Sequence, residues 1–300
     1  MKTLLTLLCT LCLALDIPSR PTDTFTIPGD PVGVPPSNQT IDLGGKTVTG
    51  VRLPRPKWDT TTKTFGNVPQ LINSYCQGEV TIANGRIGNL VGAAIKTQAT
   101  AAAFTIRDVH FFSIGSDQTF PRPGETPPEG RIDSAVLLVT AKRITLDGVR
   151  FTGCCQSGKW SNVMYLSSDL VRMRNCSFTD CGRFGQSPNL LTPTSRPQWV
   201  VEDCEFQAGE WTTDGVTWKP SDWFWRTDYV ISMNRCKFSG RFATMLGYLN
   251  PSSCVFADND YSQATFADPG AAVNMVVGGA PNWCSLDAWV AQGKDIQAKR

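Results

Sequence analysis

Histidine is almost absent from this sequence, and so is any net charge. His110 is the one histidine among 300 residues, and 28 basic against 26 acidic residues leave a formal charge of +2. A single histidine disfavours His-based catalytic triads and His-rich metal sites. Without a basic excess to neutralise a phosphate backbone, nucleic-acid binding is disfavoured as well.

Short chemical motifs are also missing. The sequence has no glycine-rich phosphate loop, no Cys/His spacing typical of a metal site and no serine nucleophile elbow. We therefore expect no metal ion and no cofactor, and we expect no nucleic acid among the partners.

Long apolar runs are lacking too. The longest, residues 3–15, is too short to span a bilayer, so we expect no membrane span. It follows Lys2 and contains Cys12-Leu13-Ala14, which fits a signal peptide over residues 1–14. One lysine is a weak positive region, so we favour the alternative, in which residues 1–37 are retained and dock as an N-terminal cap.

What the chain does have is apolar residues and cysteine. Apolar residues make up 41% of the chain and charged residues 18%, which is typical of a folded globular protein. Eleven cysteines are an odd number, so at least one thiol is free or pairs between chains. A chain this long can bury a core without a disulfide framework.

Six segments repeat one eight-residue pattern. They are VTIANGRI (80–87), FTIRDVHF (104–111), ITLDGVRF (144–151), VRMRNCSF (171–178), WVVEDCEF (199–206) and ISMNRCKF (231–238). Positions one and three are apolar, as are six and eight in most copies, and this is the alternation of half-buried strands. A seventh, partial copy is expected to end at Phe256.

Position five of the pattern predicts a sharp bend. It is occupied by residue types that tolerate a left-handed backbone: Asn84, Asp108, Gly148, Asn175 and Asp203. Arg235 breaks the series, and we expect the neighbouring Asn234 to take its place. Each unit therefore reads as two short strands joined by a one-residue corner.

The spacing of the units indicates a solenoid. Their last residues recur every 18 to 40 positions, which suits coils of about 20–30 residues that bury a continuous core. Apolar runs before the units, such as residues 135–139, 163–166 and Ile95, supply a third strand per coil. The sequence predicts an all-β, single-stranded parallel β-helix.

At this point the chain resembles the pectate-lyase-like superfamily of right-handed parallel β-helices, in which corner ladders of Asn and stacked apolar ladders are habitual. The resemblance covers residues 38–265, with residues 38–50 as a first rung, and it implies a right-handed coil. The fold hosts lyases, hydrolases, adhesins and phage spikes, so it does not identify an activity. Residues 266–300 are expected to form the C-terminal cap, with Ser285 capping a short helix over 286–292 that stops at Gly293.

Four cysteines occupy inward position six of successive units: Cys176, Cys204, Cys236 and Cys254. We interpret them as buried small hydrophobes rather than as a metal or redox site. Cys154 and Cys181, each three residues after a unit, are expected to stack as well.

Outward position four carries charges of alternating sign, Arg107, Asp147, Arg174 and Glu202. We interpret them as a solvated ladder of ion pairs. Asp147 and Glu202 would lie two strand spacings apart, a separation compatible with glycoside chemistry. The structural interpretation is favoured, because nothing else marks the pair.

Two insertions lengthen the coils, residues 116–130 and 209–228. The second carries the candidate binding or interface residues Trp211, Trp218, Trp223, Phe224 and Trp225. Such aromatic side chains bury in a protein interface, stack on sugars or pack on their own coil, and we rank the three in that order. No catalytic residue is assigned.

From these features we expect a non-enzymatic structural or recognition protein, specifically a bacteriophage virion component such as a head decoration, spike or fibre. It would form a homotrimer and contact other virion proteins, with polysaccharide as a further candidate partner. One alternative is a secreted polysaccharide lyase or glycoside hydrolase, and another is a carbohydrate-binding adhesin at the cell surface.

Overall fold

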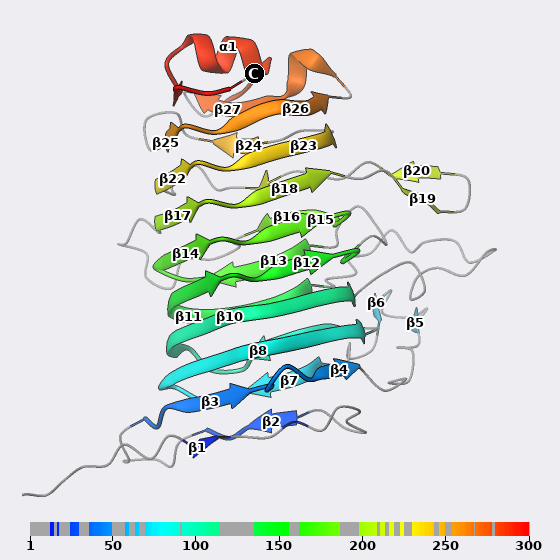
Figure 1. Cartoon of the computed structure of the whole chain (residues 1–300), viewed down its shortest axis with the longest axis vertical. Coiled ribbons are helices and arrows are strands. Elements are labelled where there is room, and N and C mark those ends of the chain that lie inside the picture. Colours follow the sequence, from blue (N-terminus) through cyan, green and yellow to red (C-terminus); the bar gives the residue numbers. More distant parts are fainter. Residues whose placement is uncertain are drawn as a thin grey trace, which may run out of the picture.

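The computed structural model is a right-handed parallel β-helix whose coils stack along one long axis (Figure 1). It describes residues 13–14, 17, 25–29, 36–49, 58–59, 64–65, 70–90, 92–114, 135–155, 162–186, 198–208, 211–213, 216–218, 223–224, 230–242, 246–249, 254–266, 268–277 and 280–299. No helix in this part of the chain is long and apolar enough to cross a membrane. The predicted insertion at 116–130 lies outside the described residues.

Two parallel sheets form the coils. Sheet 1 contains β1 (Leu13–Ala14), β3 (Gln39–Asp42), β4 (Thr47–Thr49), β8 (Glu79–Leu90), β10 (Ala101–Ile114), the second half of β11 (Ala135–Asp147), β12 (Arg150–Thr152), β14 (Leu170–Arg174), β15 (Ser177–Thr179), β17 (Gln198–Glu202), β18 (Glu205–Ala208), β22 (Val230–Asn234), β23 (Lys237–Phe242), β25 (Cys254–Ala257), β26 (Asp260–Phe266) and β29 (Asp295–Ile296).

Sheet 2 is formed by the predicted third strand of each coil. It contains β2 (Phe25–Ile27), β7 (Gln70–Ser74), β9 (Ala93–Thr97), the first half of β11, β13 (Asn162–Ser167), β16 (Arg183–Gln186), β21 (Trp223–Phe224), β24 (Leu246–Leu249), β27 (Val273–Val277) and the antiparallel β28 (Ala280–Cys284). Two small hairpins, β5 (Trp58–Asp59) with β6 (Thr64–Phe65) and β19 (Trp211–Thr213) with β20 (Val216–Trp218), lie outside both sheets.

The predicted register of the six units is confirmed. Phe104 pairs with Val80 and with Ile144, and Val171 pairs with Ile144 and with Trp199. Position eight forms one buried column of five rings: Phe111, Phe151, Phe178, Phe206 and Phe238. Neighbouring ring centroids in this column lie 5.2, 4.8, 5.2 and 5.1 Å apart, so like side chains stack along the axis.

The left-handed corners also lie where the sequence places them, with one exception. Asn84, Asp108, Gly148, Asn175 and Asp203 all have φ between 52° and 63°. The expectation that Asn234 replaces Arg235 is wrong, because Arg235 itself adopts φ 54° while Asn234 stays in its strand. Arg235 Nε and Nη2 donate to the two carboxylate oxygens of Asp203 at 2.7 and 2.9 Å, which offsets part of the cost of a left-handed arginine.

The predicted position of the seventh, partial unit is wrong. Cys254 pairs with Ile231 and Phe256 with Met233, so both lie in the first strand of the coil rather than the second. The corner falls at Asp258 with φ 57°, and Tyr261 continues the ring column 5.0 Å from Phe238. The cysteine ladder therefore ends at Cys236, and Asn259 takes the next inward place.

Both ends of the solenoid carry extra elements. At the N-terminal end, β1 extends sheet 1 by pairing with β3, and β2 extends sheet 2 by pairing with β7. At the other end, the predicted helix is present as α1 (Leu286–Ala291), preceded by the short 3-10 helix η2 (Pro269–Ala271). Ser285 Oγ accepts from the Ala288 N–H at 3.1 Å, and buried Trp289 packs edge-on against Phe256.

Candidate functional site

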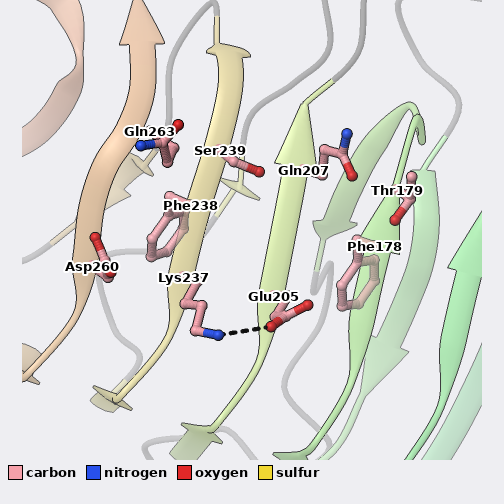
Figure 2. A pocket seen from close by; sticks show the side chains of 9 residues that line it. All are labelled: Phe178, Thr179, Glu205, Gln207, Lys237, Phe238, Ser239, Asp260 and Gln263. Atoms are coloured by element: carbon pink, nitrogen blue, oxygen red, sulfur yellow. Dashed lines mark hydrogen bonds and ion pairs between the residues drawn. The ribbon is translucent and has the colours of Figure 1, made fainter.

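A shallow cavity of about 170 Å³ lies on the outer face of sheet 1, across β15, β18, β23 and β26 (Figure 2). Its lining residues are Phe178, Thr179, Glu205, Gln207, Lys237, Phe238, Ser239, Asp260 and Gln263. They come from four successive coils, so only the stacking of the solenoid brings them together.

Strand alternation explains which side chains face the cavity. Position seven of the units points outward, and its residues pair in register as a single line that we call the outer row: Arg86, His110, Arg150, Ser177, Glu205, Lys237 and Asp260. A second outward line, two residues further on, contributes Thr179, Gln207, Ser239 and Gln263. Phe178 and Phe238 of position eight alternate with these lines along β15 and β23, and their rings are buried on the inner face of the sheet (Figure 2).

One ion pair crosses the cavity. Lys237 Nζ lies 3.1 Å from Glu205 Oε1, and the two side chains are 66% and 61% exposed. A pair this exposed contributes at most about 1 kcal/mol to folding. Its polar groups remain accessible to a ligand, with both a donor and an acceptor side by side.

A β-bulge shapes the C-terminal wall. Lys237 pairs with Asp260 and Ser239 pairs with Gln263, so Tyr261 and Ser262 together face the single residue between Lys237 and Ser239. Asp260 Oδ1 accepts from the Ser262 hydroxyl at 2.7 Å and from the Ser262 N–H at 3.0 Å. These hydrogen bonds, and then the charges of Lys299 and Lys237, lower the pKa of Asp260. This carboxylate therefore stays ionised as an acceptor and is unsuited to act as a general acid at neutral pH.

The cavity thus presents hydrogen-bonding groups of both kinds beside apolar surface. Two carboxylates accept, one ammonium donates, and amides and hydroxyls do both. This combination matches the hydroxyl groups of a sugar chain better than it matches an apolar small molecule.

The structure divides the predicted aromatic residues between two places. Trp211 and Trp218 are directly opposed in the β19–β20 hairpin, which follows β18 and projects from its end (Figure 1). Trp223 and Phe224 form β21, a rung of sheet 2 between β16 and β24. Trp225 lies outside the described residues.

The alternating ladder at position four has the predicted register, since Arg107 pairs with Asp147, Asp147 with Arg174, and Arg174 with Glu202. Asp147 accepts from the side-chain amide of Asn175 at 3.2 Å. Glu202 lies 3.5 Å from Arg235. The two carboxylates thus make structural contacts, but the predicted ion pairs are absent: among the described residues no salt bridge joins successive members of this ladder, and Glu202 pairs with Arg235 instead.

The cysteines are core residues. None of the nine cysteines in the described part of the chain forms a disulfide, and Cys176, Cys204 and Cys236 are buried in successive coils. Hydrogen bonding with the Cys204 thiol and then burial raise the pKa of Cys176 far above its usual range, which makes it inert. Cys181 contacts Cys154 in the same way, as predicted. Among the described residues, no three His, Cys, Asp or Glu side chains gather as a metal ion would require.

Sequence reasoning missed the cavity residues Gln207, Lys237 and Asp260. The signal that could have found them is the outward position seven of the repeat, read across coils rather than along one strand. Comparison with protein-family models, with curated proteins and with solved structures finds no match. The internal geometry alone therefore establishes the fold, a parallel β-solenoid with a stacked aromatic core.

Proposed function

We propose that this chain is a non-enzymatic structural and recognition protein that binds a glycan along the outer row of sheet 1. The observation that carries the proposal is the cavity itself. Its donors and acceptors sit on a stiff ladder of strands spaced by about 4.8 Å, close to the length of one sugar unit. Such a scaffold positions several hydrogen-bonding groups without paying for loop ordering.

We further propose that the protein is a virion component, such as a head decoration, spike or fibre, and assembles as a homotrimer with other virion proteins. Support comes from the fold-level resemblance to the pectate-lyase-like β-helices, which include phage spikes. The unbridged, buried thiols fit folding in a reducing compartment such as the cytosol of a host cell. Equilibrium sedimentation of the full chain measures the trimer, and a monomer would contradict it.

Glycan binding is tested by removing two amides from the cavity. In the double variant Gln207→Ala/Gln263→Ala we expect affinity for a bound glycan to fall about tenfold or more, since each lost hydrogen bond costs about 0.5–1.5 kcal/mol. Arg172→Ala, an exposed change on β14 away from the cavity, is the control and should bind like the parent. Titration calorimetry on hits from a glycan array gives the affinities. Equal binding by all three proteins would contradict the proposed site.

A polysaccharide-cleaving enzyme is the second candidate, because Glu205 and Asp260 flank Lys237 in the outer row. Two strand spacings separate these carboxylates, about 9–10 Å, near the range of inverting glycoside hydrolases. The lowered pKa of Asp260 suits a general base but not the general acid that such a pair also needs. Release of reducing ends or unsaturated uronates by the parent protein, lost in Asp260→Asn, would replace the binding proposal with this one.

The compartment is tested by counting thiols. In denaturant without reductant, the freshly purified protein should show at least nine reactive thiols, because none of the nine described cysteines is bridged. A maleimide mass shift in intact-protein mass spectrometry measures the number. A count near one or zero would indicate an oxidised, secreted protein and would remove the virion proposal.

A further inference from the structure

The N-terminal half of the outer row is basic. Arg86, His110 and Arg150 pair in register on β8, β10 and β12, so three basic residue types occupy successive rungs about 4.8 Å apart. All three belong to position seven, which points away from the core. Both arginines are exposed and His110 is half-buried.

The charge of this half lacks the pairing found at the cavity end of the same row. In the described part of the chain, neither Arg86 nor Arg150 forms an ion pair, whereas Lys237 of the same row pairs with Glu205. Like charges directly opposed on neighbouring strands destabilise a sheet. Arg86 and Arg150 lie two strands apart with His110 between them, so this repulsion arises when His110 is protonated, and the two arginine charges are available to a ligand.

The arginine nearest the N-terminal end is held in place. Phe112 pairs with Gly88, and the Phe112 ring packs over this glycine. A Cβ atom at position 88 would collide with the ring, so only glycine leaves room for it. The Arg86 guanidinium carbon is 4.9 Å from the centre of the Phe112 ring. Stacking on an aromatic face fixes the plane of a guanidinium and leaves its N–H edge free to bind an oxyanion.

The histidine is positioned as well. His110 Nε2 and Thr152 Oγ1 share a hydrogen bond of 3.0 Å, and the imidazole lies 5.6 Å from the Phe112 ring. Arg86 and His110 thus pack against Phe112 and Thr152 on the strands of sheet 1.

We propose that Arg86, His110 and Arg150 bind a carboxylate or sulfate group carried by the glycan. This inference rests on the proposed function and names the chemistry of the ligand. The outer row runs without a break from Arg150 through Ser177 to Glu205 in the cavity, so one chain lying along the axis reaches both places.

The charges along the row restrict the ligand further. Glu205 and Asp260 at the cavity end repel a chain with an anionic group on every unit. A nucleic-acid backbone is disfavoured for the same reason. The ligand class that fits is a glycan with neutral and anionic sugars in alternation.

Binding of such a ligand should strengthen in acid. Burial, followed by the charges of Arg86 on β8 and Arg150 on β12, lowers the pKa of His110 below its ordinary 6.5. The free protein therefore carries a neutral imidazole at pH 7.5, and protonation below the lowered pKa adds a third positive charge. A bound anion favours the protonated form, so affinity rises as the pH falls.

The test uses the full chain and four probes of similar length. These are hyaluronan oligosaccharides, which carry a carboxylate on alternate sugars, chondroitin sulfate oligosaccharides, neutral dextran oligosaccharides and single-stranded DNA. Because chondroitin sulfate carries an anionic group on every sugar, we expect hyaluronan to bind most tightly, and the Arg86→Gln/Arg150→Gln variant to lose about 10- to 100-fold in its affinity for hyaluronan. His110→Gln should abolish the gain in affinity between pH 7.5 and pH 5.5.

Arg143→Gln serves as the matched control. Arg143 is an exposed arginine of sheet 1 that already pairs with Glu79 at 3.4 Å, so its loss should leave binding unchanged. Melting curves verify that every variant is folded. Tighter binding of DNA, or neutral-glycan binding with no preference for an anionic one and no effect of Arg86→Gln/Arg150→Gln, would overturn this inference alone. No binding of any glycan would overturn the proposed function with it.

Discussion

Replacing Phe178 by alanine is expected to lower the free energy of unfolding by about 3–5 kcal/mol. Phe178 is fully buried at the middle of the ring column, 4.8 Å from Phe151 and 5.2 Å from Phe206. The change leaves a cavity between two coils and removes two stacked contacts, each worth about 0.5–1.5 kcal/mol beyond its buried area. Urea denaturation followed by circular dichroism measures the loss.

Two further variants serve as controls for the loss of stability in Phe178→Ala. Phe178→Leu retains most of the volume and should cost clearly less than the alanine change. Ser177→Ala, on the same strand but facing outward, should stay within about 0.5 kcal/mol of the parent. A Phe178→Ala protein as stable as Ser177→Ala would mean that the column does not hold the coils together.

The second large effect is expected at the C-terminal cap, where Asp295→Ala should cost about 2–4 kcal/mol. Asp295 is 3% exposed, and its Oδ2 accepts from the Tyr261 hydroxyl at 2.7 Å and from Asn259 Nδ2 at 2.8 Å. Asn259 in turn accepts from the Cys236 N–H at 2.8 Å. The alanine change leaves a buried hydroxyl and an amide hydrogen without their acceptor, at the point where the ring column ends in Tyr261.

The same carboxyl predicts a pH dependence. Burial raises the pKa of Asp295, although hydrogen bonds from Asn259 and Tyr261 oppose the shift. The pKa of Asp295 is therefore higher in the folded than in the unfolded protein. The stabilisation from this carboxyl is complete below the unfolded pKa of about 3.8, and it is lost as the pH rises through the folded pKa. Asp295→Asn keeps the shape and cannot titrate, so its stability relative to the parent should improve from pH 4 to pH 7. Thermal melts across that range measure the difference, and a constant difference would contradict the assignment.

The fold could be predicted from the sequence because every coil imposes the same constraints on its residues. Inward positions must be apolar and the corner must tolerate a left-handed backbone, so each unit carries both signals. The prediction failed where a different residue type fills the same structural position. Tyr261 replaces a phenylalanine, Asn259 replaces a cysteine, and Arg235 adopts the corner with help from Asp203.

The cavity could not be predicted in the same way. Outward positions are free of packing constraints, so the residue types at position seven and beyond it follow no regular pattern along the chain. Glu205 and Lys237 are 32 residues apart in sequence, yet their side chains touch. The tryptophan-rich insertion was predicted to bind a partner because of its composition. Its sequence did not predict that Trp211 pairs with Trp218 in a hairpin.

A double-mutant cycle on the ring column tests the register of the coils most directly. Leucine substitutions at Phe151 and Phe178, whose rings are stacked 4.8 Å apart, should show a coupling energy of about 0.5–1.5 kcal/mol. The same substitutions at Phe111 and Phe206, which are separated by two intervening rings, should be additive within about 0.5 kcal/mol. Coupling that is absent in the first pair, or equal in the two pairs, would contradict the stacked solenoid.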